Sequence, residues 1–210
     1  GLPADMDSIV QIGRDMGIPI VADAAPAIGA SYKNRPMGQC GADLSVLSFN
    51  GNKTVTSGGG GAVIGDDGEA LNLVRHLSST ARAGADYDHD QAGFNYRMTN
   101  LQAAVAYGLG KEDAYFDGLN GDMQARRDRL GAGLAEIGFD VIPCEGTYFI
   151  TTDFRPLGFN GTDEEFCRYI TTEARVAAVP VSAFYEGADI NHFARFCFCK
   201  EAASLDEALN

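Results

Sequence analysis

The chain has 210 residues, of which 45% are hydrophobic, so it holds enough apolar material for one or two globular domains. Its formal net charge is -13, from 16 Lys and Arg against 29 Asp and Glu, and such a charge would repel a phosphate backbone, which argues against a nucleic-acid partner. No apolar run approaches the length of about eighteen residues that marks a membrane-spanning helix, and no signal peptide is visible, so we expect no membrane partner.

The first predicted elements are a helix and a strand. Apolar residues recur at helical spacing over residues 5–16, and the short apolar run at 18–22 predicts a strand buried on both faces of a parallel sheet. Asp23 ends this strand. An aspartate in this place can bond nearby backbone as a turn former, or it can face a ligand, because ligands of open α/β sheets bind at the carboxyl ends of strands. The sequence leaves both interpretations open.

Residues 44–64 predict a strand, a polar turn with Lys53 at its tip, a glycine run and a second strand. The glycines allow backbone conformations closed to other residues and leave room for a ligand against bare main chain. A P-loop requires glycine directly before the lysine and another further upstream, where this chain has Asn52 and Leu47. We therefore exclude ATP and GTP.

The remaining chain continues to mix helices and strands. Helices are predicted at 67–78, after a cap at Thr99 or Asn100, at about 115–137, at 162–174 and from Ser204. Strands are predicted at 139–142, 147–152, 176–180 and 194–198. The polar, aperiodic segment 79–91 is predicted to be a long surface loop. This order indicates an α/β domain over residues 1–112, ending in an interdomain helix, and a small α+β domain over residues 113–210.

The cysteines and histidines give no sign of a metal site. The five cysteines are an odd number without a CxxC pair, which argues against a disulfide framework and against structural zinc. The three histidines have no metal-ligand spacing, so we predict no metal centre. Reduced thiols are typical of a cytoplasmic protein.

Three motifs suggest a family. They are residues 21–33, residues 48–53 with the glycine run that follows, and residues 93–98. In order and spacing, over about residues 2–106, they resemble the DegT/StrS-type sugar aminotransferases, which are pyridoxal phosphate enzymes of fold type I. The resemblance implies an incomplete fold type I large domain followed by a small α+β domain. It also implies that earlier strands, a phosphate-binding loop and a ring-stacking aromatic precede the part of the fold that this sequence covers.

The same resemblance assigns roles to individual residues. Lys53 would hold pyridoxal phosphate as a Schiff base, and Asp23 would pair with the pyridine nitrogen. Ser48 would contact the phosphate, with Asn50 supporting the phosphate or the turn. Asn95 would reach the phosphate of the neighbouring subunit, which implies a homodimer. The implied reaction transfers an amino group from an amino acid to a keto-sugar nucleotide.

The chemistry of these residue types agrees with such roles. An amine on a flexible stem can form an imine and then carry a proton between the substrate carbon and the cofactor carbon. A carboxylate that faces the ring nitrogen keeps this nitrogen protonated, so the electrons of the cleaved C–H bond can be accepted by the ring.

The second half of the chain resembles a different family. Residues 115–119, 126–130, 145–149 and 194–198 are similar to the small domain of class I amino-acid aminotransferases. In that family the arginine that matches Arg195 clasps the substrate α-carboxylate, which suits a guanidinium fork. A strand arginine in a surface ion pair is the alternative.

The two resemblances meet near residues 101–106, which indicates a hybrid chain. The sequence therefore keeps two further hypotheses open. One is an amino-acid/2-keto-acid aminotransferase, and the other is a non-catalytic fragment that retains only the fold.

Overall fold

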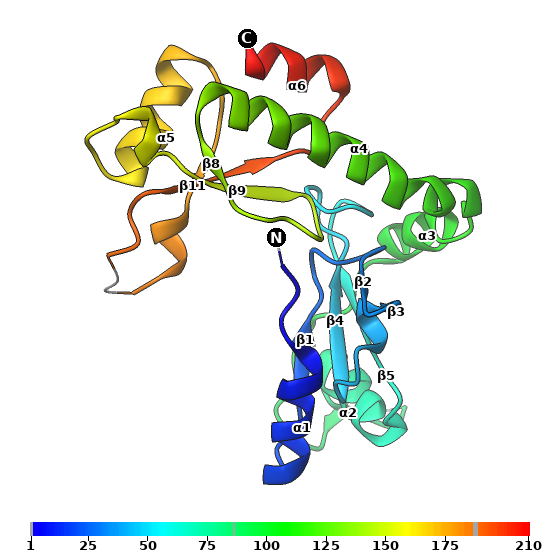
Figure 1. The fold of residues 1–210 in the computed structure, drawn as a ribbon. Helices are drawn as coiled ribbons and strands as arrows, with labels where there is room; N and C mark the ends of the chain where they lie inside the picture. The colour runs from blue at the N-terminus through cyan, green and yellow to red at the C-terminus, as the bar shows by residue number, and fades with distance from the viewer. Residues whose placement is uncertain (1, 86, 187–188) are drawn as a thin grey trace. The chain divides into compact units, whose positions relative to one another are not determined.

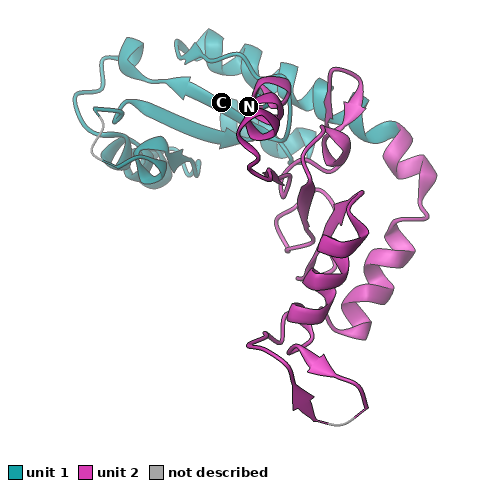
Figure 2. Ribbon diagram, turned by 90° about the horizontal axis from the view of Figure 1, so that it is seen from below, with its two compact units in different colours: residues 1–3, 118–210 teal, residues 4–117 magenta. Residues whose placement is uncertain are grey.

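The computed structural model describes residues 2–85, 87–186 and 189–210, and the chain divides into two compact units (Figure 1). Unit 2 contains residues 4–117, and unit 1 contains residues 118–210 together with 1–3 (Figure 2). The division falls inside helix α4 (Asp113–Ile137).

Unit 2 is built on a three-stranded sheet with the strand order β1-β4-β5. Strand β1 (Val21–Asp23) pairs in parallel with β4 (Leu44–Ser48), and β4 pairs in antiparallel with β5 (Gly61–Gly65). The parallel pairing expected from the sequence is therefore confirmed for β1 and β4. Strand β5 runs the opposite way because the segment 49–60 folds straight back along β4, with the Phe49 amide donating to the Gly60 carbonyl.

Helix α1 (Met6–Met16) covers one face of this sheet at β1. It begins at the cap residue Asp5, whose side chain accepts from the Ser8 amide. Its apolar side packs into a small core with residues of later segments. The buried members of this core are Met6, Val10, Ala22, Tyr32 and Cys40. The prediction that β1 is buried on both faces is wrong, because Val21 is 60% exposed and lies on the face that α1 does not cover.

Unit 2 contains further helices and short strands besides α1 and this sheet. Helices α2 (Gly68–Ser78) and α3 (Asn100–Leu109) lie where the sequence predicts helices, and Thr99 caps α3 in a capping box with Gln102. The shorter elements are β2 (Ser31–Tyr32), β3 (Arg35–Pro36), η1 (Met37–Gln39), β6 (Arg82–Ala83) and β7 (Asp88–His89). The pair β6-β7 lies inside the predicted loop 79–91, because strands of two residues show no periodicity that a sequence could reveal.

Unit 1 holds an antiparallel sheet with the strand order β10-β11-β9-β8. These strands are β8 (Asp140–Val141), β9 (Phe149–Asp153), β10 (Val179–Pro180) and β11 (Phe193–Cys197). Its helical elements besides α4 are η2 (Arg155–Leu157), α5 (Asp163–Glu173), η3 (Val181–Phe184) and α6 (Ala202–Leu209). The predicted capping box of α5 is confirmed between Thr162 and Glu165, whereas α6 begins at Ala202 without a side-chain cap, so the predicted start at Ser204 is wrong.

The core of unit 1 is rich in aromatic rings. Phe154 and Phe166 stack with their ring centroids 4.2 Å apart, and Phe159 meets Phe166 edge to face. The buried members are Leu130, Leu134, Tyr148, Ile150, Phe154, Phe166, Cys167, Ala194, Phe196, Phe198 and Leu205. Among the described residues of both units, no helix combines the length and the apolar character that crossing a membrane would take.

Candidate functional site

The candidate site of unit 2 lies at the carboxyl ends of β1 and β4. These strands are parallel neighbours, and Asp23 at the end of β1 lies in register with Val46 of β4. Asp23 and the segment 49–60, which holds Lys53, therefore follow the same edge of the sheet (Figure 1). Carboxyl ends of adjacent parallel strands are where open α/β sheets bind their ligands.

Asp23 acts as a turn former and still keeps one oxygen available. Its Oδ1 accepts a hydrogen bond of 3.0 Å from the Ala25 amide. The side chain is exposed, and Oδ2 has no hydrogen-bond partner among the described residues. The two interpretations of Asp23 are therefore compatible, because the turn uses only one of the two carboxylate oxygens.

The loop around Lys53 (residues 49–60) is closed by its own backbone. The Lys53 amide donates to the Asn50 carbonyl at 3.0 Å, and the Ser57 amide donates to the Phe49 carbonyl at 3.0 Å. The Lys53 side chain is half-buried, and its Nζ has no hydrogen bond or ion pair with any described residue. The turn, closed by these backbone bonds, thus presents an amine that no described residue binds.

Ser48 and Asn50 belong to the same loop. Ser48 Oγ accepts from the Asn50 amide at 3.3 Å, and Asn50 Nδ2 donates to Asn52 Oδ1 at 3.3 Å. Asn50 thus supports the turn, which is one of its two predicted roles. The Ser48 hydroxyl hydrogen has no acceptor among the described residues, so it is available to an anion.

The glycine run serves loop geometry more than ligand access. Gly58 and Gly60 have φ of +80° and +86°, which favours glycine. A Cβ at Gly60 would lie 2.5 Å from Met98 Cε, and one at Gly59 would lie 2.8 Å from Gln102 Nε2. The expectation that the run leaves room for a ligand is therefore wrong at these two positions, where protein side chains fill the space.

Tyr115 is a further member of this loop that the sequence does not reveal. Its hydroxyl donates to the carbonyl of Thr54, directly after the lysine, at 2.8 Å. The two residues are 61 positions apart, so no local pattern could have indicated the bond.

Asn95 lies with a different group of residues. It forms a bridge with Ser79 at the end of α2, and it lines a polar surface hollow. The other lining residues are Ser79, Thr80, Arg82, Gly84 and Arg97. The structure therefore places Asn95 in the same hollow as two arginines, of which Arg82 also lies over the Tyr87 ring and donates to the Ala85 carbonyl.

Arg195, the predicted substrate ligand of unit 1, packs against two aromatic rings. Its Cζ lies 4.3 Å from the ring centroid of Phe149 and 4.5 Å from that of Phe184. Its Nε is buried without a hydrogen-bond partner, and no described carboxylate forms an ion pair with it. The alternative of a surface ion pair therefore finds no partner among the described residues. No sequence pattern indicates that Phe149 and Phe184 lie against Arg195, because both are distant from it along the chain.

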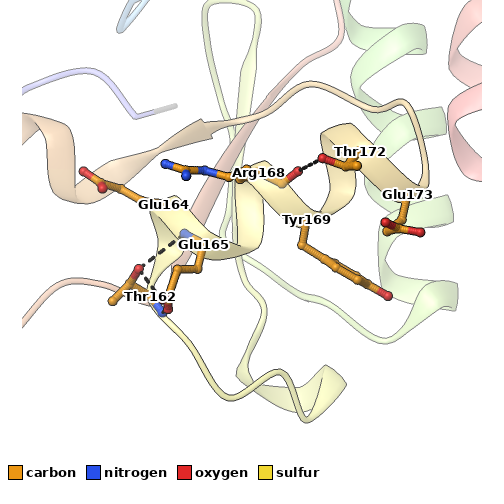
Figure 3. Close-up of a pocket in the computed structure, with 7 residues that line it drawn as sticks. All are labelled: Thr162, Glu164, Glu165, Arg168, Tyr169, Thr172 and Glu173. Atoms are coloured by element: carbon orange, nitrogen blue, oxygen red, sulfur yellow. Dashed lines mark hydrogen bonds between the residues drawn. The ribbon is translucent and has the colours of Figure 1, made fainter.

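A second hollow lies along the exposed side of α5 (Figure 3). Its lining residues are Thr162, Glu164, Glu165, Arg168, Tyr169, Thr172 and Glu173. Thr162 and Glu165 satisfy each other in the capping box, and the Thr172 hydroxyl donates to the Arg168 carbonyl at 2.9 Å (Figure 3). We interpret this surface as a solvated helix face.

Comparison with protein families matches residues 1–135 to the DegT/DnrJ/EryC1/StrS aminotransferase family. This match covers more than half of the chain. The chain belongs to this family. The matched region contains the candidate residues Asp23, Ser48, Asn50, Lys53 and Asn95, and it does not contain Arg195.

Individual relatives of the DegT/DnrJ/EryC1/StrS chain are of two kinds. GDP-perosamine synthase of Escherichia coli is 40% identical over 106 residues, which cover 50% of this chain and 29% of the relative. DapC of Mycobacterium tuberculosis, a probable N-succinyldiaminopimelate aminotransferase, is 47% identical over 118 residues, which cover 52% of this chain and 30% of the relative.

A solved structure extends the likeness to nearly the whole chain. The N-succinyldiaminopimelate aminotransferase from Mycobacterium tuberculosis matches with a TM-score of 0.73 and 32% identity, over 98% of this chain and 52% of that one. The chain therefore has part of the fold of the fold type I aminotransferases, as the resemblance implied. The chain spans about half the length of this solved relative.

Proposed function

We propose that this chain is part of a pyridoxal phosphate-dependent aminotransferase that transfers an amino group from an amino acid to a keto-sugar nucleotide. The observation that carries the proposal is the pair of groups at one sheet edge. Asp23 ends β1, and Lys53 lies in the loop after its parallel neighbour β4. The Lys53 amine and one oxygen of Asp23 have no partner among the described residues. Family membership and relatives such as GDP-perosamine synthase support the sugar substrate.

The side chains of this site fit the cofactor. Bound pyridoxal phosphate supplies an electron sink for the pair left by C–H cleavage. The Lys53 amine would hold the cofactor covalently and, when released, move a proton to or from the substrate carbon. The free oxygen of Asp23 would hold a proton on the ring nitrogen, and the Ser48 hydroxyl would donate to the phosphate. Asn50 would keep the turn in place.

The proposal includes a homodimer, in which Asn95 reaches the phosphate held by the partner subunit. The support is its position in a hollow with Arg82 and Arg97, since guanidinium groups suit a phosphate. We also propose a cytoplasmic location, which the five thiols without a disulfide support. Sedimentation of the full chain with pyridoxal phosphate tests the dimer, and a monomer that still binds the cofactor through Lys53 would contradict it.

The direct test is spectroscopic. Pyridoxal phosphate is added to the full chain, to Lys53→Ala and to Lys111→Ala, and the absorbance of the imine band is followed. We expect the band in the wild type and in Lys111→Ala, whose lysine lies on the surface, and no band in Lys53→Ala. A band that is absent from all three, or that persists in Lys53→Ala, would refute the proposal and favour a non-catalytic fragment.

A second candidate function is favoured by Arg195. An amino-acid/2-keto-acid aminotransferase needs a partner for the substrate carboxylate, and Arg195 has a buried Nε that no described residue satisfies. We expect Arg195→Ala to raise KM for a keto acid sharply and to leave a sugar substrate nearly unaffected. The matched control is Arg168→Ala, which removes an exposed arginine from α5. An unchanged KM for the keto acid would exclude Arg195 from the site.

A further inference from the structure

Arg195 packs against two aromatic rings, and its side chain makes no hydrogen bond with any residue that the structure describes. The two ring centroids lie 4.3 Å and 4.5 Å from its Cζ, and none of its side-chain N–H groups bonds to a described residue. A part-buried arginine normally satisfies its five donors, because an unsatisfied buried donor costs stability. The side chain is therefore held in place by its flat faces while its N–H edge remains unused.

The first ring comes from the neighbouring strand. Arg195 lies opposite Thr151 of β9, and Phe149 lies two positions before Thr151, opposite Cys197. Alternate residues of a strand share a face, and diagonal neighbours on one face are within reach of aromatic and long side chains. The register of β9 and β11 thus places the Phe149 ring against the guanidinium.

The second ring is held by a separate anchor. Phe184 ends η3, and Ser182, two positions earlier in η3, donates to Asp163 twice, from its amide and from its hydroxyl, both at 2.7 Å. Asp163 is fully buried at the first turn of α5, so this anchor is fixed. Phe184 itself is 57% exposed and takes no part in the core of unit 1. Its described aromatic contact is with Arg195.

We propose that Phe149 and Phe184 are positioning residues that orient the guanidinium of Arg195 and make its free edge selective for a planar carboxylate. The inference rests on the proposed carboxylate role of Arg195. Ring faces attract the cation and exclude water from it, while the donors remain in the guanidinium plane. A carboxylate can accept two of these donors within that plane. The oxygens of a tetrahedral phosphate project out of the plane toward the electron-rich rings, so phosphate fits less well.

The test measures the Arg195 side chain directly by NMR. The full chain is labelled with ¹⁵N, and the Nε–H signal of Arg195 is assigned by its loss in Arg195→Lys. Pyruvate and, separately, inorganic phosphate are titrated, and the signal reports binding of each. We expect pyruvate to bind at least about tenfold more tightly than phosphate in the wild type, because the planar anion can accept two donors without turning further oxygens toward the two rings.

Variants of Phe184 separate orientation from folding. Phe184→Leu keeps an apolar side chain at an exposed position and removes the ring, and we expect pyruvate affinity to fall about threefold to tenfold, which lies between the exposed and the desolvated values of a cation–π contact. Phe184→Tyr keeps the ring and should restore affinity to near that of the wild type. The ring-current shift of the Nε–H signal, measured without ligand, shows in each variant whether a ring still lies on the guanidinium.

The outcomes distinguish the two levels of the proposal. If Phe184→Leu loses the ring-current shift and still binds pyruvate as the wild type does, the positioning role is refuted and the carboxylate role of Arg195 stands. If phosphate competes equally with pyruvate, the selectivity is refuted. If pyruvate leaves the wild-type Arg195 signal unchanged, the carboxylate role fails and the inference fails with it.

Discussion

Replacing Gly60 with alanine tests how the glycine run closes the loop around Lys53. Gly60 has φ of +86°, and a left-handed conformation costs an L-residue roughly 1–2 kcal/mol. Its new Cβ would lie 2.5 Å from Cε and 3.0 Å from Cβ of Met98, so the methionine must shift. Because the nearer atom ends a flexible side chain, we take the overpacking cost as about 1 kcal/mol, the lower end of its usual range. Gly60→Ala should therefore lower the free energy for local opening of the loop around Lys53 by about 2–3 kcal/mol.

Gly58 is the matched control for this substitution. Its φ is +80°, and a Cβ there meets no atom within 4 Å, so Gly58→Ala should cost only the backbone part, roughly 1–2 kcal/mol. The Phe49 amide donates to the Gly60 carbonyl, so its native-state hydrogen exchange measures the local opening of the loop around Lys53. This local measurement is preferred because the chain has two units, which need not unfold in a single step.

A double variant isolates the steric part of the cost. If Met98 causes the extra destabilisation, the change from Gly60 to alanine should cost no more in a Met98→Ala background than Gly58→Ala costs alone. Equal effects of the two single glycine variants, or an excess at Gly60 that survives Met98→Ala, would refute the packing argument.

The remaining predictions concern unit 1. Phe154→Ala removes a fully buried ring stacked on Phe166 and should destabilise the unit by roughly 3–5 kcal/mol in denaturant unfolding, and a loss below about 1 kcal/mol would contradict this. Hydrogen bonds from Arg155 lower the pKa of Asp153, so the stability that this pair contributes is present above the unfolded pKa and is lost as pH falls through the folded pKa. Asp153→Asn should therefore reduce the slope of the unfolding free energy against pH below about pH 4. An unchanged slope would show that the Asp153–Arg155 pair does not cause this pH dependence. Burial raises the pKa of the Cys167 thiol to about 11, so mass spectrometry should show no alkylation at pH 8 until the chain unfolds, and rapid labelling of the native chain would disprove it.

The sequence predicts those parts of the molecule whose cause is local. Helix α5 begins at its predicted capping box because Thr162 and Glu165 are three positions apart and satisfy each other. The pairing of β1 with β4 follows from short apolar runs that end in polar turns. Asp23 and Lys53 thereby come to one sheet edge, and the residue types at that edge could be named in advance.

The unpredicted parts depend on partners that are distant in sequence. The hydrogen bond from Tyr115 to Thr54 and the packing of Met98 against Gly60 have no local pattern. The same holds for β1, whose apolar composition suggested full burial although only one of its faces meets a helix. Composition tells what a strand could bury, and only the three-dimensional neighbours decide what it does bury.

The two candidate substrates depend on groups that belong to different units. The Lys53 loop is closed by its own backbone and by Tyr115, all within unit 2. The Arg195 site is built from β9, η3 and β11, all within unit 1. Because the contacts named for each site come from a single unit, each site provides the control for the other. Lys53→Ala should leave the Arg195 Nε–H signal in place, and Arg195→Ala should leave the lysine-dependent absorbance intact. A variant that abolished both signals would have unfolded the chain, and it would say nothing about either role.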